Sequence, residues 1–282
     1  MTSNPRIASL GRLALRGGAV GLVLPALLLT VWEALSRYGV VPTNLLPPPL
    51  AVLRALRDLS VSGELPGHIE ITLFRVLVGF LAGTAVATVL AALTGYSPLW
   101  RRLLDPTFQA LRSIPSIAWV PLFILWLGIY EASKVTLIAL GAFFPIYLNT
   151  MAGIQQVDRK LVEVARIHGY GGAALVRRVL LPATLPAYIT GLRGGLGLAW
   201  MFVIAAELMG ASEGLGFLLL DGQQTGRPAN IIASILLFAV FGKASDVALA
   251  ALGRRFVRWQ DSFQSAEEKK ADAADPARLQ EV

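Results

Sequence analysis

Cysteine is absent from this sequence, and only two histidines occur, His68 and His168. Without cysteine the chain can form no disulfide, no thiol nucleophile and no cysteine-ligated metal site. Two histidines are too few for a typical histidine metal site, although carboxylates could still bind an ion. We therefore expect no metal site and no cofactor held by this chain.

Charged side chains are also scarce. They make up 15% of the residues, against about 25% in ordinary soluble proteins. Hydrophobic residues make up 55%, and the mean hydropathy is +0.62. The apolar residues come in long blocks, which is typical of membrane proteins. The net charge of +7 lies in the segments between these blocks and at the ends, as orientation in a bilayer requires, so we expect no nucleic-acid partner.

The sequence motifs of nucleotide-binding enzymes are missing as well. Gly242-Lys243 is followed by Ala244 and has no glycine five residues before it, so it is not a phosphate-binding loop. No Ser-His-Asp set and no pair of catalytic carboxylates is visible. Four glycines do not make a dinucleotide fingerprint and are expected to permit close helix packing; they are Gly191, Gly194, Gly195 and Gly197. We expect no enzymatic activity in this chain.

Six apolar blocks approach the roughly 20 residues that a helix needs to cross a bilayer. They are Gly17–Ser36, Leu73–Tyr96, the interval between Arg112 and Glu131, the stretch after Lys134 up to about Gln155, Ala187–Met209 and Asn230–Leu252. The third block contains Pro115 and Pro121, and the fourth contains Pro145. The sequence therefore predicts an all-α integral membrane protein with six transmembrane helices.

The lysines and arginines orient these helices. With the N-terminus in the cytoplasm, the inner segments hold sixteen of them and the outer segments five. Because cytoplasmic loops carry the excess of basic residues, both termini are predicted to be cytoplasmic. A cleavable signal peptide ending near Ala34-Leu35-Ser36 is the alternative, but the apolar stretch is long for one, and cleavage would leave five spans.

This orientation divides the chain into segments. Residues 1–16 form a cytoplasmic N-terminal segment, residues 17–260 the six-span domain, and residues 261–282 a cytoplasmic tail that is predicted to be disordered because it is rich in alanine, glutamate, lysine and aspartate. After the prolines at 47–49, Val52, Leu53, Leu56 and Leu59 are predicted to share one helical face. This predicts a short amphipathic helix that lies in the membrane interface or covers the bundle.

The cytoplasmic loop at residues 158–182 has its own pattern. A helix is predicted from about residue 158 to His168. Glycines then break it, because glycine readily adopts the positive φ that a tight turn needs; they are Gly169, Gly171 and Gly172. A second short helix is predicted at 173–180, ended by Pro182 and Pro186.

The residues of this loop resemble a known motif. Glu163-Val164-Ala165, Gly169, Val179 and Leu181-Pro182 have the spacing of the cytoplasmic EAA loop of bacterial ATP-binding-cassette (ABC) importer permeases, with valine for the second alanine and for the isoleucine. The segments Ala110–Ile129, Glu131–Thr150 and Ala205–Leu219 look like the permeases of the aliphatic-sulfonate, taurine and nitrate group. The resemblance covers roughly residues 30–260.

The resemblance implies a type I ABC importer permease fold in the inner (plasma) membrane of a bacterium. The chain would act as a homodimer that docks two cytoplasmic ATPase subunits, which bind ATP and Mg, and a periplasmic or lipid-anchored substrate-binding protein. It would translocate a small solute by alternating access. An aliphatic sulfonate matches best, whereas taurine, nitrate, bicarbonate and vitamin precursors remain open. The implied ATPase-coupling residues are Glu163, Ala165, His168, Gly169, Tyr170, Gly171, Leu181 and Pro182.

The third block is expected to be irregular because of Pro115, Pro121, Ser116 and Trp119, and broken helices are tolerated where they line a cavity. Charges inside a bilayer are costly and mark functional sites. We therefore expect the translocation pathway along the third and fifth blocks. The candidate pathway residues are Arg112, Ser116, Trp119, Arg193, Trp200 and Glu207. Arg193 could instead reach the cytoplasmic surface, and Glu207 could instead fix the loop at 210–216. Lys243 and Asp246, three residues apart, are expected to neutralise each other.

Two other classes of membrane protein are alternatives. A stand-alone carrier driven by protons or sodium would predict inverted repeats and carboxylates near the membrane midplane, and no convincing repeat is visible. A membrane-embedded enzyme would need a nucleophile with a base, or a cluster of metal ligands, in a span. Neither class explains the patterned cytoplasmic loop.

Overall fold

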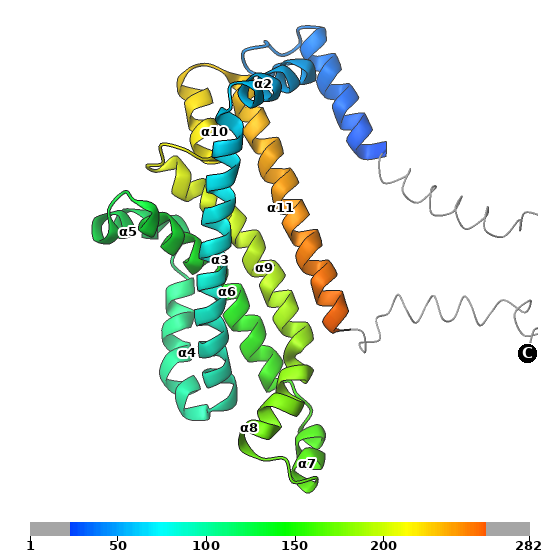
Figure 1. Cartoon of the computed structure of the whole chain (residues 1–282), viewed down its shortest axis with the longest axis vertical. Helices are drawn as coiled ribbons and strands as arrows, with labels where there is room; N and C mark the ends of the chain where they lie inside the picture. The colour runs from blue at the N-terminus through cyan, green and yellow to red at the C-terminus, as the bar shows by residue number, and fades with distance from the viewer. Residues whose placement is uncertain (1–22, 258–282) are drawn as a thin grey trace, which may run out of the picture. The chain divides into compact units, whose positions relative to one another are not determined.

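The computed structural model describes residues 23–257, except for the side chains of Ser116 and Ala173. Within this range the chain is built from helices and contains no strand (Figure 1). Residues 23–37 are helical. The other elements are α2 (Pro49–Val61), α3 (Glu64–Tyr96), α4 (Pro98–Arg112), the 3₁₀ helix η1 (Ser116–Trp119), α5 (Val120–Leu127), α6 (Glu131–Gln155), α7 (Arg159–Ile167), α8 (Gly172–Leu175), the π-helical turn η2 (Val176–Leu180), α9 (Leu181–Leu208), α10 (Leu215–Gln224) and α11 (Pro228–Phe256).

Four helical stretches of the described chain are long and apolar enough to cross a membrane, and a bent pair could supply a fifth span. The four are α3, α6, the continuous stretch Val176–Leu208 and α11. They confirm the second, fourth, fifth and sixth predicted spans. The first predicted span lies partly outside the described residues, so the total of six spans stays a prediction. The N-terminal segment and the tail at 261–282 lie outside them as well.

The third predicted span is not one continuous helix. The interval between Arg112 and Glu131 contains η1 and the eight-residue α5, and eight residues rise only about 12 Å. Pro115 precedes η1, and Gly128 ends α5 with a φ of 75°. The pair of helices that could supply the fifth span is Pro98–Arg112 with Ile117–Leu127. Proline and glycine thus break the apolar block that composition alone presented as one span.

The described chain divides into two compact units. Unit 1 comprises residues 23–81, 115–140 and 199–242, and unit 2 comprises residues 82–114, 141–198 and 243–257. Each of α3, α6, α9 and α11 contributes residues to both units. Each unit is described by itself below.

In unit 1 the amphipathic helix predicted after the prolines is α2. Val52 and Leu59 of its apolar face are buried, and Leu59 packs in a cluster with Leu65 and Leu218. This cluster joins α2 to α3 and α10. Elsewhere in the unit α3 meets α6 closely, because a Cβ built on Gly79 would lie 2.6 Å from Cγ2 of Ile138.

In unit 2 small residues let α6 and α9 approach each other. A Cβ on Gly153 would lie 2.5 Å from Cβ of Ala187, and one on Gly195 would lie 2.8 Å from Ile146. A Cβ on Gly191 would lie 3.2 Å from Cα of Ile146. The packing role predicted for Gly191 and Gly195 is confirmed. At Gly197 no atom lies within 4 Å of the position that a Cβ would occupy, so that prediction was wrong for Gly197.

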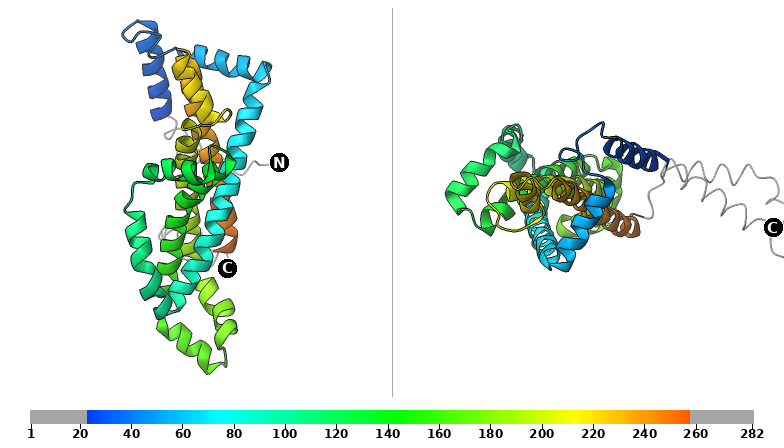
Figure 2. Two further views of the ribbon diagram at one scale, coloured as in Figure 1. Left: turned by 90° about the vertical axis from the view of Figure 1, so that its left-hand side faces the viewer. Right: turned by 90° about the horizontal axis from the view of Figure 1, so that it is seen from above.

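The helical hairpin at 158–182 also belongs to unit 2. Figures 1 and 2 show α7 beside α8 and the π-helical turn, with a short turn between them. The hairpin connects the end of α6 to the start of α9.

Candidate functional site

The first half of the candidate coupling loop is a helix with well-defined ends. The side chain of Asp158 caps α7 by accepting a hydrogen bond from the backbone N–H of Lys160 at 2.8 Å. After His168, Gly169 has a φ of 77°. The N–H of Gly169 donates to the carbonyl of Arg166 at 3.0 Å, and the N–H of Tyr170 donates to that of Ala165 at 2.9 Å. This pair of bonds is a Schellman motif, which explains why glycine follows Glu-x-Ala at this spacing.

The tip of the loop is held by contacts between its two arms. Nη1 of Arg178 donates to the hydroxyl of Tyr170 at 3.2 Å, and its guanidinium carbon lies 5.3 Å from the centre of the tyrosine ring. Nδ1 of His168 lies 3.0 Å from the carbonyl oxygen of Val164. Tyr170, Arg178 and Pro182 line a groove of about 510 Å³ on the hairpin, together with Ala165 and His168. The loop is therefore a folded element with a shaped surface.

The predicted coupling residues differ in exposure. Ala165 is buried, whereas Gly169, Gly171 and Leu181 are exposed. Glu163 pairs with Arg159 at 3.5 Å. Because both of these side chains are more than half exposed, the pair contributes little stability, and the Glu163 carboxylate is open to solvent.

The sequence predicted that Pro182 would end the second arm of the hairpin, and this prediction was wrong. The helix continues without a break through α8, the π-helical turn and α9. Pro182 is the second residue of α9, directly after the π-helical turn, and Pro186 lies within α9. An irregular turn of this kind tolerates a nearby residue that lacks an N–H donor, which is how the helix accommodates Pro182.

The candidate pathway residues are distributed over both units. In unit 2, Arg112 ends α4 and is exposed. Arg193 makes a two-pronged ion pair with Asp246, with N–O distances of 2.8 and 2.9 Å. Lys243 lies 3.8 Å from the same carboxylate. The expected pairing of Lys243 with Asp246 is present, but Arg193 is the closer partner.

In unit 1, Ser116 begins η1, and its side chain lies outside the described part of the structure. Trp119 stacks on Phe123 with ring centres 6.0 Å apart. Trp200 is buried and meets Phe238 edge-on at 6.2 Å. These two tryptophans contact different neighbours.

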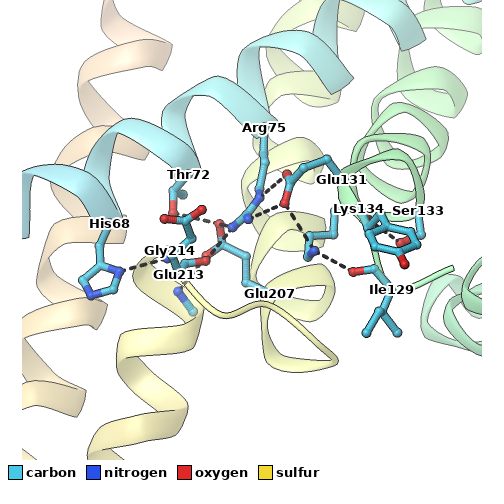
Figure 3. A network of polar contacts seen from close by, with 12 residues as sticks. His68, Thr72, Arg75, Ile129, Glu131, Ser133, Lys134, Glu207, Glu213 and Gly214 are labelled. Atoms are coloured by element: carbon cyan, nitrogen blue, oxygen red, sulfur yellow. Dashed lines mark hydrogen bonds and ion pairs between the residues drawn. The ribbon is translucent and has the colours of Figure 1, made fainter. Parts of the chain in front are cut away.

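A buried polar network, which sequence reasoning missed as a unit, is centred on Arg75 in unit 1 (Figure 3). The Arg75 side chain is 1% exposed and donates to both carboxylate oxygens of Glu131 at 2.7 Å. It also donates to Glu207 at 2.9 Å and to the carbonyl of Glu213 at 2.7 Å. Lys134 adds a second cation, with its Nζ 3.3 Å from Glu131. The network thereby ties α3 to α6 and to the end of α9.

Glu207 fixes the loop that follows α9. Its side chain is 0% exposed, and one oxygen accepts from Thr72 at 2.8 Å while the other accepts from the N–H of Gly216 at 2.7 Å. Nδ1 of His68 accepts from the N–H of Gly214 at 3.0 Å. Gly214 has a φ of 121°, and a Cβ there would lie 2.5 Å from the Glu207 carboxylate. Of the two roles considered for Glu207, this geometry supports fixing the loop.

One signal in the sequence could have revealed the network. Arg75 stands early in an otherwise uncharged apolar block, and a buried arginine in a membrane helix needs carboxylate partners. Glu131 and Glu207 are the carboxylates at the ends of two other blocks. Within residues 23–257 no group of three or more metal-ligating side chains is found.

Comparisons with known proteins define the class and then the family. The solved structure of the MetNI methionine ABC transporter contains a chain with the same fold, at a TM-score of 0.52 and 20% identity, over 64% of this chain and 92% of that one. The family model described as "Binding-protein-dependent transport system inner membrane component" matches residues 79–258. The chain belongs to this family and is a permease subunit of an ABC importer, a multi-pass inner-membrane protein.

Several curated relatives align over most of their length. Proteins that carry the name aliphatic sulfonates transport permease protein SsuC are 42% identical in Bacillus subtilis (strain 168), over 88% of this chain and 90% of the relative, and 40% identical in Escherichia coli (strain K12), over 86% and 93%. The taurine transport system permease protein TauC of Escherichia coli (strain K12) is 32% identical over 85% of this chain and 89% of the relative. These relatives do not favour the stand-alone carrier.

Proposed function

We propose that this permease imports an aliphatic sulfonate. The observation that carries the proposal is the identity of 42% and 40% to two relatives named for aliphatic sulfonates, against 32% to one named for taurine. A small solute would enter the pathway from a substrate-binding protein on the outer side. The chain itself would perform no covalent chemistry.

The working assembly would contain two copies of this chain and two ATPase subunits, with the pathway on the two-fold axis. Both termini and the loop at 158–182 would face the cytoplasm. The ATPases would bind ATP and Mg, close, and move the two loops together, which would turn the pathway outward by rigid-body movement. The folded tip and the groove beside Tyr170 support this role, because a stiff element transmits motion better than an open loop.

The coupling role is tested by co-purification of the permease in detergent with ATPases expressed from its genomic neighbourhood. The variant that combines Gly169→Asp with Tyr170→Ala should lose the ATPase while remaining folded. Gly226→Asp is the matched control, because Gly226 also has a positive φ, 66°, with no atom near a Cβ position. If the loop variant retains the ATPase as well as the wild type does, the coupling role is refuted.

The substrate is tested separately in proteoliposomes that contain the assembly and its binding protein. An alkanesulfonate should raise the rate of ATP hydrolysis more than taurine or nitrate at equal concentration. Stimulation by taurine or nitrate but not by alkanesulfonates would reject the sulfonate proposal and leave the permease role intact.

A further inference from the structure

A second groove in unit 2, of about 540 Å³, shares only Pro182 with the described lining of the groove beside Tyr170. Its walls are mostly apolar and come from α3, α6, the π-helical turn and α9, with Phe256 at the end of α11. Ala92, Ile154 and Leu185 are typical of its lining. Among the described residues that line the groove, Arg177 is the only charged one, and its side chain is exposed.

The groove opens where membrane-spanning helices end. Tyr96 is the last residue of α3 and Phe256 the last of α11, and both line the groove. Val176, the first residue of the spanning stretch Val176–Leu208, lines it as well. Ile154 is the last residue but one of α6. Helices of this length end at the surface of the bilayer, so the apolar walls lie at the depth of acyl chains and Arg177 lies toward the lipid headgroups.

One buried hydroxyl in the groove has no partner in the described structure. Thr150 is 5% exposed, and its Oγ1 makes no hydrogen bond. Several other helical threonines bond to the carbonyl four residues earlier, namely Thr88, Thr94, Thr136, Thr184 and Thr190. Thr84 also has a buried hydroxyl without a partner, but it does not line the groove. A buried hydroxyl left unpaired is unfavourable, so an oxygen atom of a bound molecule would satisfy Thr150.

We propose that this groove binds an anionic phospholipid of the membrane leaflet next to the coupling loop. An acyl chain would lie along the apolar walls, the phosphate would pair with Arg177, and an ester oxygen would accept from the more deeply placed Thr150. The chemistry is that of basic pockets between membrane helices that bind acidic headgroups.

The lipid would also touch the connection between the coupling loop and α9. Val176, Arg177 and Leu180 belong to the π-helical turn and line the groove. Such turns often occur at functional sites. Occupancy of the groove therefore fixes the base of the second arm of the hairpin.

The purified full chain in micelles containing equal amounts of dioleoylphosphatidylglycerol and dioleoylphosphatidylcholine tests the proposal, with bound lipid measured by native mass spectrometry. Wild type should retain the anionic lipid preferentially. Arg177→Gln should reduce this preference about fivefold, the ratio expected for one basic residue near an anionic headgroup. Arg178→Gln removes the same charge one residue away, where the guanidinium contacts Tyr170 instead, and should keep the preference. Equal preferences in wild type and the Arg177 variant would overturn the proposal.

A second variant tests the apolar part of the site. Leu185→Trp fills the groove and should lower the retention of both lipids, and unchanged retention would overturn the proposal. A photoreactive residue at position 92 should capture phospholipid. Capture of the tail at 258–282, or of a second copy of the chain, would show a different occupant and overturn the proposal as well. These measurements need no ATPase, so their outcome is independent of the coupling test.

Discussion

The clearest test of the buried network is the substitution Arg75→Met, which keeps a long apolar stem and removes the charge. Arg75 makes four hydrogen bonds of 2.7 to 2.9 Å, three of them to carboxylates. Without it, Glu207 would keep the donors Thr72 and Gly216 but would be a buried anion with no cation. Removing one partner of a buried ion pair costs about 3–5 kcal/mol.

Two further variants distinguish the cost of an unpaired buried charge from a general loss of stability. Glu131→Gln acts on a side chain that is 46% exposed, where an ion pair contributes at most about 1 kcal/mol. The double variant Arg75→Met with Glu207→Gln removes both buried charges. It should be more stable than Arg75→Met alone, because the cost comes mainly from the unpaired charge.

The assay is the midpoint of thermal unfolding of the purified chain in detergent. At about 2–4 °C per kcal/mol, Arg75→Met should lower the midpoint by roughly 6–20 °C, and Glu131→Gln by only a few degrees. The double variant should fall between the two. A midpoint for Arg75→Met equal to that of wild type, or a double variant less stable than Arg75→Met, would refute this account of the network.

Three further predictions concern packing and pairing, each measured by the same thermal midpoint. Gly214→Ala should destabilise more than Gly226→Ala, because both have positive φ but only Gly214 lies against the Glu207 carboxylate; equal losses would contradict the loop geometry. Arg193→Ala should cost about 1 kcal/mol and more than Lys243→Ala, because Arg193 is the closer partner of Asp246; the reverse order would make Lys243 the principal partner. Gly153→Leu should disrupt the contact of α6 with α9, whereas Gly197→Leu should be tolerated because its surroundings are open; a similar loss in both would show that close packing is not the reason for Gly153.

The hairpin at 158–182 was predictable to the extent that its signals are local. Asp158 at the start of α7 and Gly169 after its end act on backbone groups within a few residues, so their spacing alone predicts a helix and a turn. The continuation through Pro182 was not predictable, because proline usually ends a helix and only the π-helical turn before it allows the chain to go on.

The partners of the buried charges, by contrast, could not be predicted from the sequence. Arg75 was visible in the sequence as a charge within an apolar block, but its partners Glu131 and Glu207 stand 56 and 132 residues away. No local sequence pattern relates positions so far apart. The pairing of Arg193 with Asp246, 53 residues apart, was missed in favour of the nearby Lys243 for the same reason.

The sequence by itself determined the membrane class, four of the spanning helices and the helix-glycine-turn pattern of the loop, because hydrophobic length and capping chemistry depend on consecutive residues. Only the tertiary structure decided which short helices, η1 and α5, make up the irregular third block, which glycines admit a neighbouring helix, and which carboxylates neutralise Arg75. These features depend on side chains that the folded chain brings together from distant positions. Their energies come from burial and close contact, which a linear pattern does not contain.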